Sequence, residues 1–513
     1  MDHHEIIEKF RDEAVRLLRG LVSYPSVKGP AETGMPFGAA VQGAYEYLLR
    51  EAETDGFETF NADNFGGHID WRGAVLDARG EVARAAVETL GIPIHIDVVP
   101  AGDGWTKDPW VGEEEDGRIY GRGTTDDKGP AVSVYLAMKA LKASGYIPSK
   151  NVRLIIGLDE ETGWSGMDEY FKRTAPPDFG FSPDADFPVI NGEMGMMVFE
   201  IAKKLEPSQG KGLHLRSMKG GTAPNMVPDN CRAVLVYDDG EPASAKTRSR
   251  SGKSRGKSAK PAKADSERAA AFEKVMIAAE AFRSRTGRAI ACRGAGKALE
   301  VSAQGISAHG AHPEKGLNAI SVLAEFLSEL SLASESAQSF IDFYRNYIDF
   351  ELDGKHLGIA MSDEPSGALI VNSGMIDISA EAAILTVNVR CPVTKSEDDV
   401  YEALRPALDK NGLGVVKVSG MAPLYFPPDD PFIQTLLAVY QKHTGDREHG
   451  PLVMGGGTYA RAIPNAVAFG PRFPDDEDVM HQKDEYVKID SLMRAAHIYA
   501  DAILELTKGL QEG

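Results

Sequence analysis

Two adjacent aspartates, Asp126 and Asp127, stand in the segment GRGTTDDKGP at residues 121–130. The glycines and the proline around them predict a tight turn and not a helix. Neighbouring like charges repel one another, so the pair needs an explanation. A solvated acidic turn is the plainest interpretation of the segment taken alone. The chemical interpretation is that a cation lies against the turn, and this requires further ligands elsewhere in the chain.

Histidine and carboxylate residues follow several short apolar segments. His95 and Asp97 end the run IPIHIDVV, in which alternate side chains of a strand would face the same way. A carboxylate two residues away can orient an imidazole ligand. Taken singly, such residues are ordinary core histidines or solvated turns, so only the whole set is informative. Its other members are Glu160 and Glu161 after NVRLIIGLD, Asp184 in FSPDADFP, and His481 in MHQKDEY.

The elements that would position these residues have the order of an α/β fold. Residues 92–99 and 151–159 are apolar runs expected to form buried strands, and residues 131–145 between them are expected to form a helix ending at a glycine. Strand, helix, strand predicts a parallel sheet, whose sites collect at the carboxyl ends of the strands. The candidate ligands fall at such ends. Imidazoles with carboxylates suit zinc or a similar divalent ion better than calcium.

The pattern of elements changes near residue 195. From there, strand-like segments such as CRAVLVYDD and AILTVNVRCP alternate with long helical ones, which is typical of an α+β domain. The last part of the chain returns to long helices around a loop-rich centre. We therefore predict a first domain over residues 1–194 that is completed by residues 425–513, with a second domain over residues 195–424 inserted into it.

The composition narrows the class of protein. The chain has 513 residues and a formal net charge of −20, which argues against a general binder of nucleic acid or of anionic membranes. Its three cysteines form no paired framework, so reduced thiols are expected. No apolar run approaches the roughly 20 residues that a membrane span needs. These observations predict a cytoplasmic protein.

One segment, residues 242–264, differs from the remainder of the chain. It contains eight lysines and arginines and no acidic residue. Almost no apolar side chains are available to offset the entropy of ordering it, so we predict a disordered surface loop. A tether for nucleic acid or for an acidic partner is the alternative interpretation.

Seven motifs, taken in order, resemble those of the M20 metallopeptidases, and most closely those of the PepV-like (Xaa-His dipeptidase-like) bacterial branch. The resemblance covers nearly the whole chain apart from the basic segment, and it is less specific for the substrate than for the family. It implies a zinc-peptidase-like α/β catalytic domain with a mostly parallel sheet, interrupted by an α+β lid of doubled ferredoxin-like type. The motifs are HIDVVPAGDGW, YGRGTTDDKGP, GLDEETGWSG, FSPDADFP, GISAHGAHPEKGLNA, GGGTYAR and MHQKDE.

The resemblance also implies a cofactor, two zinc ions per chain, with Mn²⁺ or Co²⁺ as alternatives. Asp126 would bridge both ions, and in relatives the peptide bond after this aspartate is cis. His95 and Asp184 would complete the ligands of one ion. Glu161 and His481 would complete those of the other.

The remaining site residues follow from the same resemblance. Glu160 would be the general base, Asp97 would hold the tautomer of His95, and His309 would stabilise the oxyanion. Without the resemblance, the asparagine of APNMVPD would be read as a turn cap and the arginine of NVRCP as a surface ion-pair residue. The substrate would be held by these two residues, Asn225 and Arg390, and by the loop residues Gly456, Gly457 and Thr458.

The function predicted from this resemblance is hydrolysis of small dipeptides by a water that two zinc ions activate. An N-acyl-amino-acid amidohydrolase of the aminoacylase or desuccinylase type, built on the same centre, is the alternative. A catalytically silent metal-binding protein would be expected to lack Glu160 or a ligand, and all are present. The length of the inserted domain predicts a doubled lid and therefore a monomer. The sequence specifies neither the preferred side chains nor the native metal.

Overall fold

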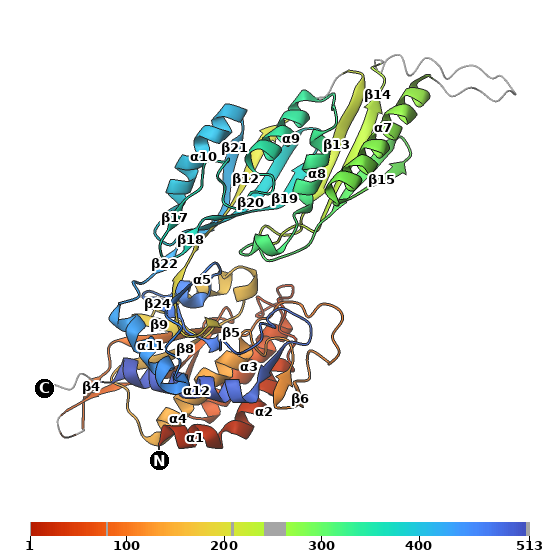
Figure 1. Cartoon of the computed structure of the whole chain (residues 1–513). Coiled ribbons are helices and arrows are strands. Elements are labelled where there is room, and N and C mark those ends of the chain that lie inside the picture. Colours follow the sequence, from red (N-terminus) through yellow and green to blue (C-terminus); the bar gives the residue numbers. More distant parts are fainter. Residues whose placement is uncertain (1, 78, 80, 207–209, 241–262, 509–513) are drawn as a thin grey trace. The chain divides into compact units, whose positions relative to one another are not determined.

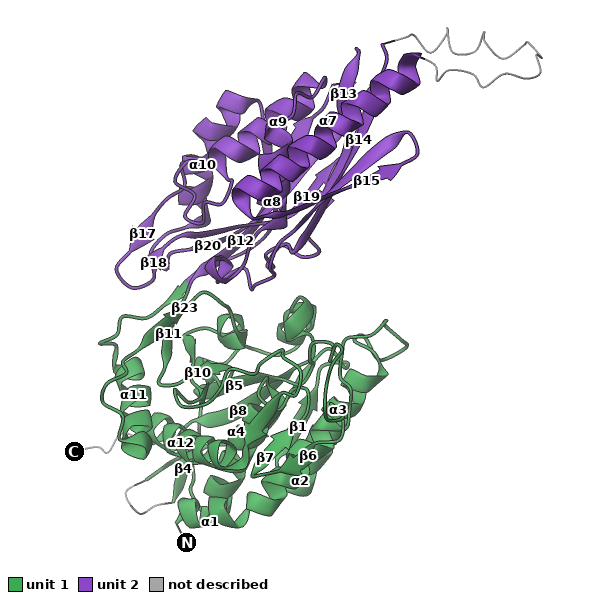
Figure 2. Ribbon diagram, turned by 45° about the vertical axis from the view of Figure 1, so that its right-hand side comes forward, with its two compact units in different colours: residues 1–193, 424–513 green, residues 194–423 purple. Residues whose placement is uncertain are grey.

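The computed structural model describes residues 2–77, 79, 81–206, 210–240 and 263–508 (Figure 1). The chain forms two compact units, one made of Met1–Glu193 with Leu424–Gly513 and the other of Met194–Pro423 (Figure 2). The second unit is thus an insertion into the first. Of the predicted disordered loop, residues 242–262 lie outside the described part of the chain. Its last two residues, Lys263 and Ala264, begin helix α7 (Lys263–Thr286), so the prediction of disorder is wrong for them.

A mixed sheet forms the centre of the first unit. Its strand order is β1-β2-β8-β5-β9-β24-β11-β22, with β23 also paired to β11. The pairs β5–β8, β5–β9 and β9–β24 are parallel, whereas β1–β2 and β2–β8 are antiparallel. The strands span β1 (Glu58–Asn61), β2 (Gly67–Trp71), β5 (Thr89–His95), β8 (Asn151–Gly157), β9 (Phe179–Ser182), β11 (Ile190–Glu193), β22 (Leu424–Tyr425), β23 (Leu452–Met454) and β24 (Ala466–Ala468).

The predicted strand–helix–strand unit is present as β5, α4 (Lys128–Ser144) and β8. The helix ends where Gly145 adopts a left-handed conformation, with φ of 87°, which glycine takes without a steric penalty. Strand β5 ends at His95, two residues before Asp97. Asp97 therefore lies beyond the strand end, although its carboxylate still lies 3.5 Å from Nδ1 of His95.

Helices complete the first unit. The long C-terminal helix α12 (Ile489–Thr507) packs against α4, α11 (Pro431–Thr444) and α1 (His3–Lys9). The apolar faces of these helices share one hydrophobic core with the central strands. The other helices are α2 (Arg11–Val22), α3 (Ala39–Thr54) and α5 (Ser165–Phe171). Within the described ranges, no helix has the length and apolar character that crossing a membrane requires.

An antiparallel sheet with helices on one face forms the second unit (Figure 2). Among the described residues of this unit, the sheet has eight strands and is accompanied by four helices, twice the content of one ferredoxin-like unit. The predicted α/β fold interrupted by an α+β domain is confirmed. In spatial order the strands are β15 (Ala289–Ala295), β16 (Ala298–Gln304), β14 (Asn230–Asp238), β13 (Gly212–Gly220), β19 (Ile370–Ile378), β20 (Ala382–Cys391), β12 (Gly195–Lys204) and β21 (Gly414–Met421), and the helices are α7, α8 (Ala319–Ser328), α9 (Glu335–Tyr347) and α10 (Glu397–Asn411).

Candidate active site

Asp126 lies at the centre of the candidate site, in the turn that leads into α4. Its Oδ1 atom is 2.8 Å from Nε2 of His95, and its Oδ2 atom is 2.8 Å from Nε2 of His481. Each carboxylate oxygen therefore faces a different histidine. The Asp126–Asp127 peptide bond is cis, as the resemblance implies. With its two oxygens facing different histidines, the Asp126 carboxylate could bind two cations at once.

Two groups of ligand atoms share this aspartate. His95, Asp126 and Asp184 form one group, and Asp126, Glu161 and His481 form the other, with the ligand atoms of each group within 4.8 Å of one another. Nε2 of His95 is 3.8 Å from Oδ2 of Asp184, and Nε2 of His481 is 3.2 Å from Oε1 of Glu161. The structure thus brings together all five residues predicted as metal ligands.

The residues of the site come from separate parts of the first unit. His95 ends β5, Asp126 precedes α4, and Glu161 lies in a 3-10 turn (Glu160–Thr162) shortly after β8. Asp184 follows β9. His481 lies in a late loop and has a φ of 62°, an uncommon conformation for a non-glycine residue. The ends of the parallel strands β5, β8 and β9 therefore bring His95, Glu161 and Asp184 to one edge of the sheet. His481 comes from a loop that is distant in sequence.

Asp97 connects two parts of the site. Nδ1 of His95 is 3.0 Å from the backbone carbonyl oxygen of Asp97 and 3.5 Å from its carboxylate. The carboxylate itself accepts hydrogen bonds from the backbone N–H groups of Glu160, at 3.1 Å, and Glu161, at 3.2 Å. The carbonyl is thus the nearer partner of the imidazole. The side chain holds the turn that bears the predicted base.

Asp127 is completely buried and does not face the ligand groups in the way Asp126 does. Its Oδ2 atom accepts a hydrogen bond of 3.1 Å from the backbone N–H of His95. The two adjacent aspartates thus have different tasks: Asp126 presents its carboxylate to both histidines, and Asp127 fixes the end of the strand that carries one of them.

The charges of the site are consistent with bound cations. Burial, followed by the repulsion of neighbouring carboxylates such as Asp126, raises the pKa of Asp184 well above its ordinary value. Burial and the nearby Asp184 likewise raise the pKa of Glu160 well above its ordinary value. Burial opposes a charge on His481, but hydrogen bonds to Asp126 and Glu161 outweigh it and raise its pKa to about 10. Divalent cations bound at these ligands would displace protons from them.

Glu485 supports the Asp126 turn and was not identified from the sequence. Its fully buried carboxylate binds the Arg122 guanidinium at 2.6 Å and accepts hydrogen bonds from the backbone N–H groups of Gly123, at 3.1 Å, and Thr125, at 2.9 Å. It lies four residues after His481 and so ties the two loops together. The signal in the sequence was Arg122, a cation between two glycines that would need an anionic partner once buried.

The glycine-rich loop lies beside the metal-ligand groups, since the ring of the following Tyr459 packs edge-on against His95 with centroids 6.3 Å apart. Thr458 is buried, and its hydroxyl donates to Glu193 Oε1 at 2.8 Å. The backbone N–H of Thr458 donates to the same carboxylate at 3.3 Å. These donors of Thr458 therefore bind protein, and the predicted contact of Gly456, Gly457 and Thr458 with substrate stays a prediction.

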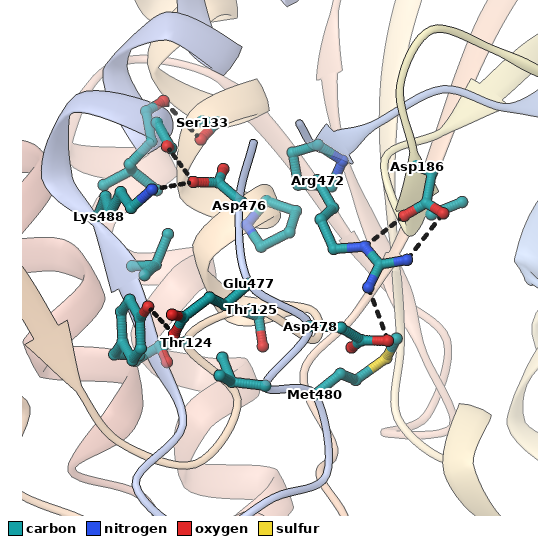
Figure 3. A pocket seen from close by; sticks show the side chains of 18 of the residues that line it. Thr124, Thr125, Ser133, Asp186, Arg472, Asp476, Glu477, Asp478, Met480 and Lys488 are labelled. Atoms are coloured by element: carbon teal, nitrogen blue, oxygen red, sulfur yellow. Dashed lines mark hydrogen bonds and ion pairs between the residues drawn. The ribbon is translucent and has the colours of Figure 1, made fainter. Parts of the chain in front are cut away.

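A pocket borders the Asp184 side of this centre (Figure 3). Thr124 and Thr125 of the Asp126 turn form part of its wall, together with Asp184. On another wall, Arg472 forms ion pairs with Asp186 and Asp478. Charged side chains in this wall are thus paired with one another, and the pocket leaves space next to a candidate metal ligand.

Three predicted residues belong to the second unit. The backbone carbonyl of Asn225 accepts a hydrogen bond of 2.7 Å from the N–H of Gly310, which places Asn225 next to His309. Asn372, not identified from the sequence, holds this loop by donating to the carbonyls on either side of Asn225, those of Pro224 and Met226. Arg390 is only 3% exposed in β20, which rules out an exposed surface ion-pair residue.

The chain is similar to known proteins over nearly its whole length. The sequence pattern of peptidase family M20/M25/M40 matches residues 91–505. The beta-Ala-Xaa dipeptidase of Lactobacillus delbrueckii subsp. lactis is 34% identical over 514 residues, which cover 99% of each chain. Two solved structures show the same fold: the di-peptidase Dug1p of Saccharomyces cerevisiae (TM-score 0.54, 13% identity, 99% of this chain and 98% of that one) and the aminoacylhistidine dipeptidase of Vibrio alginolyticus (TM-score 0.52, 15% identity, 96% of each). The chain therefore belongs to peptidase family M20/M25/M40, whose members are hydrolases that use divalent metal ions.

Proposed function

We propose that this enzyme is a dipeptidase that uses two zinc ions. The observation that carries the proposal is the position of Asp126, whose two carboxylate oxygens each lie 2.8 Å from the Nε2 atom of a different histidine. The names of relatives such as the beta-Ala-Xaa dipeptidase support the substrate class.

The residues present fit two divalent ions. Asp126 would bind both, His95 and Asp184 would complete one set of ligands, and Glu161 and His481 would complete the other. The three ligand carboxylates offset most of the +4 charge of two zinc ions, while imidazole and carboxylate are ordinary zinc ligands. Bound there, the ions would polarise the scissile carbonyl and lower the pKa of a water molecule.

Glu160 is the residue we assign to proton transfer. Its carboxylate would accept a proton from the attacking water and deliver it to the amine that leaves. Burial raises the pKa of this carboxyl, and perturbed pKa values are common among catalytic acids and bases. The carboxylate of Asp97 would keep Glu160 in place through the backbone hydrogen bond at 3.1 Å.

The roles of His309, Asn225 and Arg390 rest on the family resemblance. We propose oxyanion stabilisation for His309 and substrate binding for Asn225 and Arg390, where a buried guanidinium suits a free carboxylate. Gly456 and Gly457 would contribute backbone N–H groups to the substrate. We further propose that the protein acts as a monomer in the cytoplasm.

A substrate panel tests the proposed function. The metal-free enzyme, reloaded with Zn²⁺, Mn²⁺ or Co²⁺, is given dipeptides with a free amino group, and in parallel N-acetyl amino acids with the same C-terminal residue. The proposal predicts hydrolysis of the dipeptides. Hydrolysis of the N-acetyl compounds alone would identify an amidohydrolase on the same centre and contradict it.

A further inference from the structure

Four of the chain's 12 histidines gather at one place on the first unit, apart from the candidate active site. His3 and His4 come from α1, His443 from the last turn of α11, and His497 from α12. All lie around Asp501, which follows His497 by one helical turn. Helices α1 and α11 both pack against α12, so the cluster is built by residues nearly 500 positions apart in the chain.

Asp501 is the centre of this histidine cluster. The residue is 4% exposed, and its Oδ1 atom lies 2.9 Å from Nε2 of His3 and 3.2 Å from Nε2 of His4. Its Oδ2 atom lies 2.9 Å from Nε2 of His443 and 2.6 Å from Nζ of Lys442. The cluster therefore places a buried carboxylate among imidazoles.

A chain of three contacts runs from Asp501 through His4 and His497 to Glu8. Nδ1 of His4 is 2.8 Å from Nδ1 of His497, and Nε2 of His497 is 2.7 Å from Oε1 of Glu8. Each contact needs one proton to be a hydrogen bond, but two neutral imidazoles supply only two. Either the ring of His4 or that of His497 must carry a second proton, or a cation other than a proton must occupy one of the three contacts.

A metal ion would complete this arrangement without charging a ring. With the ion on Nε2 of His4, the Nδ1–H of His4 donates to His497, and the Nε2–H of His497 donates to Glu8. Two neutral rings then satisfy two hydrogen bonds. An imidazole ligand whose other nitrogen is held by a partner is the usual arrangement in metal sites, because the partner fixes the tautomer and the orientation.

We propose that this cluster binds one divalent transition-metal ion of the zinc type. The ligands are Nε2 of His4, Nε2 of His443 and a carboxylate oxygen of Asp501, whose ligand atoms lie within 4.8 Å of one another. His497 and Glu8 position His4. Two imidazoles and one carboxylate suit zinc and leave a fourth coordination position open. The ion would join α1, α11 and α12, so its role is to clamp these helices and not to take part in peptide hydrolysis.

Two further features affect the access of a metal ion to Asp501 and the competition for its carboxylate. A surface pocket lined by Lys442, Asp501 and Glu505 gives solvent a route to the carboxylate. The Lys442 side chain is 67% exposed, so its ammonium can leave Asp501 for water at little cost. It is also a cation that competes with the metal for the same oxygen. Removing this lysine should therefore strengthen metal binding, whereas it would weaken a cluster held together by ion pairs alone.

The experiment compares zinc binding to the full chain, without a polyhistidine tag, in four forms. Metal-free wild type, His443→Ala, Lys442→Ala and the control His356→Ala, which removes an exposed histidine of the second unit, are titrated with Zn²⁺ against a chromophoric chelator. We expect His443→Ala to bind one equivalent fewer than wild type and His356→Ala to bind the same number. Lys442→Ala should keep that equivalent with an affinity at least about threefold higher, since a competing charge is gone. The comparison is independent of how many ions the active site holds.

Thermal unfolding gives a second measurement and guards against a misfolded variant. Saturating Zn²⁺ should raise the Tm of wild type more than that of His443→Ala or of a second variant, His4→Ala, because a ligand that binds only the folded state stabilises it. Dipeptide turnover of both variants should remain at the wild-type level. Equal zinc stoichiometry in wild type, His443→Ala and His4→Ala would overturn the proposal, and so would weaker zinc binding by Lys442→Ala.

Discussion

The Oδ1 atom of Asp97 accepts a hydrogen bond of 3.1 Å from the backbone N–H of Glu160. The other oxygen of the same carboxylate accepts the N–H of Glu161 at 3.2 Å. One buried aspartate thus fixes the turn that bears both the proposed base and a proposed metal ligand. Its contact with His95 is made chiefly through the backbone carbonyl, at 3.0 Å. Asp97 is therefore best described as a positioning residue for the Glu160 turn.

Replacing Asp97 tests this description. Asp97→Ala should lower kcat by about 10–100-fold, the usual effect of losing a group that orients a metal ligand, because the turn is no longer held. Asp97→Asn keeps one carbonyl oxygen as an acceptor, so its kcat should fall less than that of Asp97→Ala. Both variants retain the backbone carbonyl that contacts His95. If Asp97→Asn were as inactive as Asp97→Ala while KM stayed constant, the charge of Asp97, and not its hydrogen bonds to the turn, would be the important property.

Glu160→Ala should lower turnover by about 10²–10⁴-fold, the usual contribution of a general base. Zinc content should remain at the wild-type level, because Glu160 belongs to neither group of ligand atoms. The measurements are steady-state kinetics on a dipeptide and metal analysis of the purified variant. Glu161→Ala is the matched comparison, since the adjacent carboxylate should lose metal as well as activity. Wild-type turnover in Glu160→Ala would remove this residue from the mechanism.

Glu485→Ala should destabilise the protein by about 3–5 kcal/mol, because the buried Arg122 guanidinium loses its partner. Backbone N–H groups of the Asp126 turn lose their acceptor as well. Activity should fall together with stability, since the turn and the His481 loop are no longer tied. Chemical unfolding followed by circular dichroism measures the change, with Glu448→Ala, at an exposed position, as the control. Equal unfolding midpoints for the two variants would contradict this role of Glu485.

His309→Ala should lower kcat, and the residue should act within its own chain if the protein is a monomer. Mixing inactive Glu160→Ala protein with inactive His309→Ala protein is the test. The mixture should remain as inactive as its components. Recovery of activity on mixing would show that His309 acts across chains, and the monomer proposal would then fail.

Local patterns in the sequence were sufficient to predict the fold and to predict that the candidate ligands lie close together. The apolar run ending at His95, the helix that stops at Gly145 and the run before Glu160 define a parallel unit, and such a unit brings strand ends to one edge. The likeness of the surrounding motifs to a known family then assigned Asp184 and the distant His481 to the two ions. Those parts needed only periodicity, turn chemistry and motif order.

The partners of these residues could not be read from local patterns. Glu485 meets Arg122 across 363 positions, and the buried Glu193 occupies donors of Thr458 across 265 positions. Neither pair has a spacing that a helix or a strand would reveal. Strand alternation and the family resemblance predict Asp97 as the partner of His95, whereas the strand ends at His95 and the Asp97 carboxylate accepts the N–H groups of Glu160 and Glu161. Contacts that close loops over the site depend on the tertiary fold.

The sharing of two metal ions by Asp126 is the central claim, and the zinc content of Asp126→Ala tests it most directly. The measurement is made in a His443→Ala background, so that the proposed surface site does not contribute. Zinc bound per chain is determined by elemental analysis after dialysis against a weak chelator. The account predicts two zinc ions per chain with Asp126 present and fewer than one after its replacement, because a ligand of both ions is lost. Retention of both ions by a folded Asp126→Ala chain would contradict the account.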